Sequence, residues 1–436
     1  MFLKSIKKHF FKYFTSSIIC GGIGVIANKY YSYAFSPEEY GVMALYLSFA
    51  TYLQGLMAFS VDSSWQRAYF IYKDKRKNEF FSTIFIFILI AILLWLFFLV
   101  LFSDFLNNVL ANNIWLYYMA ISVAILTIVV KVFNILAYNE MLSGLFMKQN
   151  IFQSIVNNIT SFSLVELFNF SIIARFIGQI IGYTANIFLL YKFFLQHNLI
   201  ASVKLIYFRF DILKFVSKFS LPYFFIAVFG GVSTYIDKVF LLNFSGAQTL
   251  GIYSAGIIIG QIISTVIESL NNAIFPVVMT SLKEEYEQNI KKLKKIDTIW
   301  IIVLLIIGII LYLCRDILII IFSNNSYSDA SKILPLIILA YICGGCYKNC
   351  LNVLLYHNKV YYLPFATVIS SIVGIIINYL LIPKYGAIGA AFAFFMVAYV
   401  YGLLVHIISC DFYFNYKKII YLYTIVFIIG ILFLYS

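Results

Sequence analysis

Twelve stretches of mostly apolar residues follow one another along the chain and leave little sequence between them. About 17–25 apolar residues suffice to cross the hydrocarbon core of a bilayer as a helix. Because lipid cannot hydrogen-bond a backbone, each stretch should be helical. The stretches are 14–35, 40–62, 80–103, 114–138, 149–168, 170–194, 219–243, 250–277, 298–322, 333–356, 360–382 and 386–410. The apolar run from Ile419 to Tyr435 predicts a thirteenth span.

The composition excludes a water-soluble protein. Hydrophobic residues make up 63% of the chain and charged residues 11%, whereas a soluble domain has about 25% charged residues. A length of 436 residues would otherwise favour two or three soluble domains. We therefore predict an all-α polytopic membrane protein with about 12 transmembrane helices, or 13 if the last run also spans.

The distribution of Lys and Arg predicts the orientation. Basic residues gather in the N-terminal tail and after the second, sixth, eighth and twelfth spans, whereas connections such as 36–39, 103–113 and 245–250 have almost none. Loops rich in Lys and Arg face the cytoplasm, so we expect the N-terminus and the even-numbered exits there. The basic groups are Lys4, Lys7, Lys8 and Lys12; Arg67, Lys73, Lys75, Arg76 and Lys77; Lys204, Arg209, Lys214 and Lys218; Lys283, Lys291, Lys292, Lys294 and Lys295; Lys417 and Lys418.

The net charge of +13 is therefore not a sign of nucleic-acid binding. Most of it lies in the expected cytoplasmic loops, where it suits an anionic lipid leaflet. Residues 1–13 alternate Phe, Leu and Ile with Lys in a pattern typical of a basic amphipathic helix on the membrane surface. Membrane lipids are thus expected partners, and nucleic acid is not.

The sequence shows no motif of a soluble catalytic site. Cys343, Cys346 and Cys350 share a helix face within an apolar span, which favours packing over metal binding. The Gly-x-x-x-Gly pairs at 178–182 and 256–260 favour close helix contact over phosphate binding. There is no Walker motif, no His/Cys cluster and no nucleophile–base pair at a recognisable spacing. We expect no metal, no cofactor and no enzymatic activity.

Charged residues inside the spans are the chemically informative ones. Each costs about 2.5–3.5 kcal/mol at the centre of a bilayer, so it usually faces a protein interior or a watery cavity. The excess is positive, which suits a cavity for an anionic substrate. Given the predicted orientation, the outer half holds Lys29, Arg175 and Lys238, and the inner half holds Lys131, Lys348 and Arg67. Asp62, Asp237 and Glu268 are the clearest acids and candidate sites of ion coupling.

Several of these residues have a second interpretation. Lys29 and Arg175 could extend along apolar surface to the outer interface. Asp237 and Lys238 point about 100° apart on a helix, so one of them could pair with a neighbouring helix. Glu268 is either a coupling-ion site or a structural hydrogen-bond partner.

Short motifs in chain order resemble those of one transporter family. Ser36-Pro-Glu-Glu-Tyr-Gly41 resembles the opening of the second helix of polysaccharide flippases. Leu221-Pro222, Tyr235-Ile-Asp237-Lys238 and Leu250-Gly-Ile-Tyr-Ser254 resemble their seventh and eighth helices. Asn378-Tyr-Leu-Leu-Ile-Pro383 and Gly386-Ala-Ile-Gly389-Ala-Ala391 are similar to their eleventh and twelfth. The family is the Wzx-type lipid-linked oligosaccharide flippases, within the multidrug/oligosaccharidyl-lipid/polysaccharide exporter superfamily. Its members often have Asp-Arg where this chain has Asp237-Lys238, and lysine lacks the bidentate fork of arginine for phosphate.

The resemblance implies two six-helix lobes around a central cavity that opens alternately to each side. The lobes would be 14–195 and 219–410, joined by a cytoplasmic linker at 196–218 and followed by an extension at 411–436. The implied substrate is an undecaprenyl-diphosphate-linked oligosaccharide for O-antigen or capsule synthesis in a bacterial inner membrane. Whether polysaccharide polymerase machinery is a partner stays open at this point. Arg67, Lys131, Lys238 and Lys348 are the leading cavity cations, followed by Lys29 and Arg175.

Two alternatives remain at this point. A cation-coupled multidrug exporter would share the fold, although an exporter of cationic drugs should favour an acidic cavity. A membrane oligosaccharide polymerase or glycosyltransferase would usually carry a large external loop, whereas the longest outer connection here is near 323–332.

Overall fold

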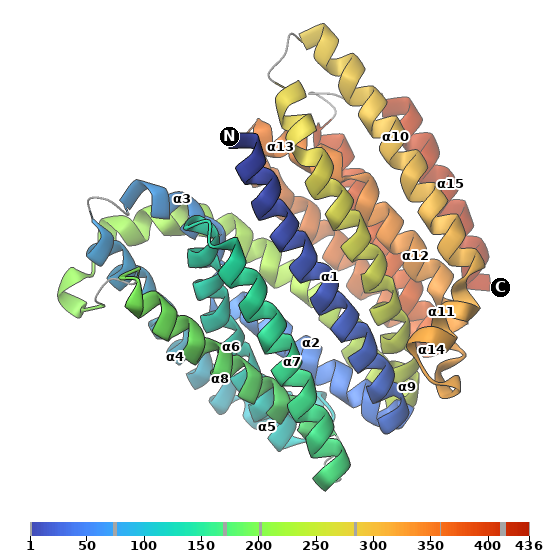
Figure 1. Ribbon diagram of the computed structural model, residues 1–436. Helices are drawn as coiled ribbons and strands as arrows, with labels where there is room; N and C mark the ends of the chain where they lie inside the picture. The colour runs from blue at the N-terminus through green and yellow to red at the C-terminus, as the bar shows by residue number, and fades with distance from the viewer. Residues whose placement is uncertain are drawn as a thin grey trace. The chain divides into compact units, whose positions relative to one another are not determined.

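The computed structural model describes residues 2–72, 76–168, 172–199, 203–282, 286–357, 359–409 and 416–435. This part of the chain contains helices and no strand, which confirms the predicted all-α class (Figure 1). The helices are α1 (Phe2–Ala34), α2 (Pro37–Met57), α3 (Val61–Tyr72), α4 (Lys77–Leu101), α5 (Ser103–Val109), α6 (Ile114–Asn139), α7 (Ser143–Phe168), α8 (Ile172–Gln196), α9 (Phe210–Ser281), α10 (Tyr286–Leu313), α11 (Arg315–Phe322), α12 (Ala330–Cys346), α13 (Lys348–Tyr356), α14 (Leu363–Ser409) and α15 (Tyr416–Tyr435). Short 3-10 turns lie at Leu205–Tyr207, Asn325–Tyr327 and Val360–Tyr362.

Contacts divide the chain into two units. The first consists of Met1–Phe35 and Met43–Gly231, and the second of Ser36–Val42 and Val232–Ser436. The first turns of α2 therefore belong to the second unit, and the first part of α9 belongs to the first unit.

Two long helices each contain two of the predicted spans. α9 has a non-helical residue at Gly246 (φ 84°) and α14 has one at Gly386 (φ 52°). Glycine tolerates these positive φ values because it has no Cβ. The break at Gly246 lies between the predicted spans 219–243 and 250–277, and Gly386 is the first residue of the predicted span 386–410. α15 is 20 residues long and contains the predicted thirteenth run.

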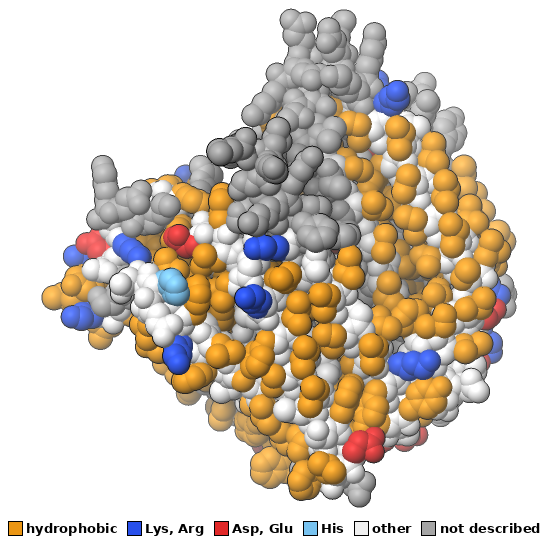
Figure 2. Space-filling view, in the orientation of Figure 1, with side chains coloured by type: hydrophobic (Ala, Val, Ile, Leu, Met, Phe, Trp, Pro, Cys, Tyr) orange, Lys and Arg blue, Asp and Glu red, His pale blue; other side chains and the backbone are white. Residues whose placement is uncertain are grey.

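The surfaces of the apolar helices are those of membrane spans. Seven helices of the described chain are long and apolar enough to cross a bilayer. In α4 and α10 less than a third of the most apolar window is buried, and side chains such as Leu93, Phe97, Ile306 and Ile309 are exposed. Figure 2 shows hydrophobic side chains over much of the visible described surface. Because a helix that is hydrophobic all round is stable only in apolar surroundings, these faces are suited to lipid.

The second predicted span ends earlier than the sequence suggested. α2 stops at Met57, and Phe59 and Ser60 have positive φ values of 46° and 49°. The chain then starts the separate short helix α3, in which Trp65 packs edge-on against Phe80 and Phe81 of α4. Residues 40–57 of the predicted span are therefore helical, 58–60 form a turn, and 61–62 belong to the next helix.

Glycines let helices of the first unit approach closely. A Cβ on Gly178 of α8 would lie 2.7 Å from the backbone oxygen of Asn157 in α7. A Cβ on Gly182 would overlap the side chain of Asn157. Close approach of helices at small residues is a common way to pack spans in lipid. The glycine pair therefore makes a packing contact, as its spacing predicted.

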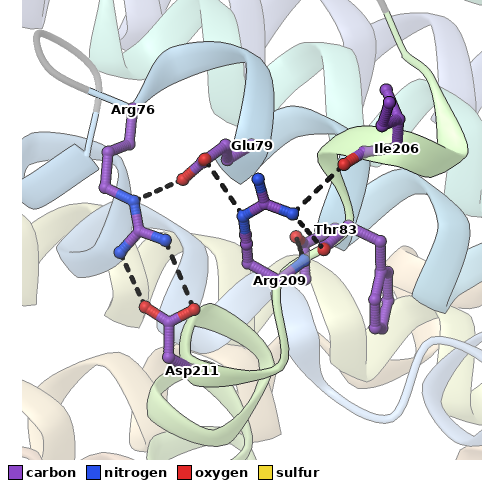
Figure 3. A network of polar contacts seen from close by, with 7 residues as sticks. Arg76, Glu79, Thr83, Ile206, Arg209 and Asp211 are labelled. Atoms are coloured by element: carbon purple, nitrogen blue, oxygen red, sulfur yellow. Dashed lines mark hydrogen bonds and ion pairs between the residues drawn. The ribbon is translucent and has the colours of Figure 1, made fainter.

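Charged side chains link residues 209–211, where α9 begins, to the start of α4. Arg76 donates hydrogen bonds from Nη1 and Nη2 to the two carboxylate oxygens of Asp211, at 2.6 and 3.3 Å, and its Nε donates to Glu79 (Figure 3). Arg209 donates to Glu79 Oε1 at 3.1 Å, and its backbone N–H donates to Thr83 Oγ1 at 2.9 Å. The guanidinium of Arg76 holds the pKa of both carboxyls below their usual range, so the network is complete at neutral pH and is lost only as the pH falls through these lowered values.

The network predicts the local stability of this segment. Asp211→Asn keeps the shape but removes the charge that holds Arg76, so we expect backbone amides near 203–209 to exchange with solvent severalfold faster. An exposed ion pair contributes little to global stability, so the effect should stay local. Hydrogen exchange with mass spectrometry measures it. Asp104→Asn, at an exposed position of α5, is the matched control. Unchanged exchange in the first variant would show that the network does not hold the segment.

Candidate functional site

A polar cavity of about 390 Å³ lies within the first unit. Ligand pockets are typically about 300–1,000 Å³, so this volume is sufficient for a small ligand or a sugar. The cavity is formed by α1, α6, α7 and α8. Its lining residues are Ser16, Ser17, Cys20, Gly24, Ala27, Asn28, Tyr138, Phe146, Asn150, Gln153, Ser154, Asn157, Asn158, Arg175, Gln179 and Tyr183. The lining is mostly amide and hydroxyl, with one arginine and no carboxylate.

Arg175 supplies the cationic group of the cavity. Its Nη1 donates to Asn158 Oδ1 at 3.1 Å and to the hydroxyl of Tyr31 at 3.3 Å. The guanidinium carbon lies 5.0 Å from the centre of the Tyr31 ring, within the range of a cation–π contact. No ion pair to Arg175 occurs in the part of the chain that the structure describes. The charge is therefore held by neutral groups and remains suited to an anion.

A stripe of amides along α7 forms much of the lining. Asn150, Gln153, Ser154, Asn157 and Asn158 recur at helical spacing, so they lie on one side of the helix. They were not among the sites predicted from the sequence, because only charged residues were considered for that prediction. The signal was nevertheless available, because five polar residues within nine positions are unusual in a membrane span.

Hydrogen bonds between helices hold part of this stripe in place. Asn186 Nδ2 of α8 donates to Gln149 Oε1 and to Gln153 Oε1, each at 2.6 Å. Gln149 Nε2 in turn donates to Asn134 Oδ1 of α6 at 2.6 Å. Because three helices share the network, Gln153 is held in the cavity wall by the protein itself. Amides that both donate and accept are suited to sugar hydroxyls, which do the same.

The other charged residues predicted in the first half are placed differently. Lys29 is half-buried on α1 and does not line the cavity, although Asn28 does. Lys131 is exposed on α6, about one turn before Asn134. The backbones of Asp62 and Arg67 belong to α3, and their side chains lie outside the described residues.

In the second unit, Asp237 and Lys238 form a buried pair. Lys238 Nζ lies 3.5 Å from Asp237 Oδ1 and donates to the backbone oxygen of Thr234 at 2.8 Å. The hydroxyl of Tyr253 donates to Asp237 Oδ2 at 2.5 Å. Asp237 and Lys238 are 2% and 7% exposed. Since both charges are already paired and buried, this arrangement favours a structural role over direct contact with a substrate.

Glu268 and Lys348 also form an ion pair, between α9 and α13. Close by, Asn352 Nδ2 donates to Asn271 Oδ1 at 3.1 Å and links the same two helices. The side chains of Glu268 and Lys348 are 47% and 21% exposed, so this pair is more accessible than that of Asp237. Of the two interpretations of Glu268, the pairing favours a structural partner.

Comparison with known proteins identifies relatives by sequence and by fold. The model of a family described as "Polysaccharide biosynthesis protein" matches residues 6–282. No curated protein matches the sequence. The structure is similar to that of the lipid II flippase MurJ in an inward closed conformation, with a TM-score of 0.69, 17% identity and coverage of 98% of this chain and 96% of that one.

Two other solved structures have the same fold. A multidrug resistance MATE family transporter of the MOP superfamily, in an inward-facing conformation, matches with a TM-score of 0.68 and 14% identity over 91% of this chain and 95% of that one. A MOP superfamily transporter from Pyrococcus furiosus matches with a TM-score of 0.61 and 13% identity over 93% and 95%. At these identities the likeness shows the fold, which is that of MATE and MurJ-like transporters.

Proposed function

Because the chain belongs to the polysaccharide biosynthesis protein family, we propose that it is a flippase for a lipid-linked oligosaccharide. The substrate would be a glycan on undecaprenyl diphosphate, moved from the cytoplasmic to the outer leaflet of a bacterial inner membrane for O-antigen or capsule synthesis. The cavity of the first unit carries the proposal, since it combines sugar-compatible amides with an arginine that no carboxylate neutralises.

The residues suggest how such a substrate would be held. Asn150, Gln153 and Asn157 would exchange hydrogen bonds with sugar hydroxyls, and Arg175 would bind an anionic group. The lipid tail would stay in the bilayer, because moving it into a polar cavity would lose its favourable apolar surroundings. Alternate opening of the lobes 14–195 and 219–410 would then expose the site to each side in turn, with the N-terminus in the cytoplasm.

A multidrug exporter is the main alternative, because MATE transporters share the fold. Two features of the cavity favour the flippase. An exporter of cationic drugs needs acidic groups where its substrate binds, whereas no Asp or Glu lines this cavity. A large apolar surface would also suit most drugs better than a wall of amides.

Deletion of the gene, followed by analysis of surface glycan and lipid-linked intermediates, tests the proposal. We expect loss of surface polysaccharide and accumulation of undecaprenyl-linked oligosaccharide in the inner leaflet, with both effects reversed by the wild-type gene. Intact glycan with raised sensitivity to cationic drugs would instead identify an exporter. Single repeat units that reach the surface without polymerisation would point to a polymerase.

A further inference from the structure

Asp297 of α10 is a buried acid that the substrate cavity does not use. It is 7% exposed, and no described side chain forms an ion pair with it. Among the described side chains, its one hydrogen bond comes from Asn349 Nδ2 of α13, at 3.2 Å from Asp297 Oδ1. A carboxylate in surroundings of low polarity is costly unless a cation or several donors compensate it. A single amide donor is weak compensation for a full charge.

Asn349 has an unsatisfied group of its own. It is 2% exposed, and in the described structure its Oδ1 has no hydrogen-bond partner. Buried amide oxygens are nearly always paired, so this oxygen is an acceptor that a new donor could use. In this couple, the amide and the acid, Asn349 Nδ2 donates to the acid, while Asn349 Oδ1 accepts no hydrogen bond from a described group.

The couple lies beside a break in a membrane helix. α12 ends at Cys346 and α13 begins at Lys348, so Asn349 is in the first turn after the break. The indole Nε1 of Trp300, one turn after Asp297 on α10, donates to the backbone oxygen of Gly345 at 2.9 Å. The carbonyl of Gly345 is thus held by a side chain of α10, next to the couple.

We propose that Asp297 and Asn349 form a proton-binding site. In the charged state the Asn349 N–H donates to the carboxylate, as the structure shows. When Asp297 takes a proton from water, its new O–H becomes a donor, and a turn of the Asn349 amide places the idle oxygen as the acceptor. The charge is removed, and the acid and the amide keep one hydrogen bond between them in either state, with donor and acceptor exchanged.

Asp297 is the acid of this couple, which no described side chain neutralises by an ion pair. Among described residues, the thiol of Cys346 on α12 is within electrostatic reach of Asp297. Lys348 is paired with Glu268 of α9, and Tyr423 of α15 contacts His406 of α14. On α10 itself, Lys294 and Lys295 are exposed.

A proton site in the second unit would give the proposed flippase an energy source. This consequence rests on the proposed function, but the site itself does not, since binding of a proton requires no glycan. A flippase without a working site would still bind its substrate and would lose the dependence of transport on the pH difference across the membrane.

Trp300 provides a direct optical readout of the site. In purified full-length protein with Trp65, Trp95 and Trp115 replaced by phenylalanine, we expect Trp300 fluorescence to titrate with a single midpoint as the pH is varied at constant NaCl. Asp297→Asn should abolish the titration, because the amide cannot ionise. Asp316→Asn is the matched control, since it neutralises an acid of the second unit whose side chain is 69% exposed, and it should leave the titration intact.

A second variant keeps the test decisive if Asp297→Asn does not fold. Asn349→Ala removes the donor that stabilises the carboxylate, so the midpoint should move to higher pH by about one unit. The proposal is overturned if both variants titrate like the parent. It is equally overturned if Trp300 responds to Na⁺ at constant pH, with choline chloride as the reference salt, and not to pH. Neither result would affect the flippase proposal, which the deletion experiment tests separately.

Discussion

Replacing Arg175 with glutamine should reduce export of the surface glycan by about 10- to 100-fold. A hydrogen bond to a charged group contributes about 1.5–3 kcal/mol, and each 1.4 kcal/mol is a factor of ten in binding. Arg175 is the one cation among the residues that line the cavity, so no neighbour in the lining replaces it. Complementation of the deletion strain, with quantified surface polysaccharide and membrane-protein level, measures the effect.

Two further variants separate charge from shape at this position. Arg175→Lys keeps the charge but loses the planar fork and the stacking on Tyr31, so export should be intermediate. Lys192→Gln removes an exposed charge from the same helix, away from the cavity, and should export normally. Normal export by Arg175→Gln at wild-type protein level would contradict the assignment of this cavity to the substrate.

Replacing Asp237 with asparagine should destabilise the protein by about 3–5 kcal/mol, the usual cost of breaking a buried ion pair from one side. Asparagine has the same shape and still accepts from Tyr253, but Lys238 is left buried without an anion. Thermal unfolding of the detergent-solubilised variant, and its yield from membranes, measure the loss.

Replacing Lys238 as well distinguishes an unpaired buried charge from general disruption of the fold. In the double variant Asp237→Asn/Lys238→Met no charge remains buried, so most of the lost stability should return, because apolar replacements of buried ion pairs are often neutral or stabilising. If the double variant is as unstable as Asp237→Asn alone, the stranded ammonium is not the reason for the loss.

The sequence determined the class of protein and most of its helices. Its apolar runs were each long enough to cross a bilayer, and in lipid such a run has only one local solution, a hydrogen-bonded helix. The break at Gly246 lies between two predicted spans and that at Gly386 on the first residue of the twelfth, and glycine adopts positive φ readily at both. The motifs in chain order also indicated the family, which the match over residues 6–282 confirms.

The tertiary structure decided which polar residues meet. The charges of Lys238 and Arg175 look alike in the sequence, yet Lys238 is buried against Asp237 whereas Arg175 lines a cavity without an anion. Asp297 and Asn349 lie 52 positions apart, and nothing local pairs them. Whether a charge inside the membrane is neutralised depends on the side chains that neighbouring helices place beside it. These side chains are set by the rotation and packing of the helices, which the apolar pattern of one span does not determine.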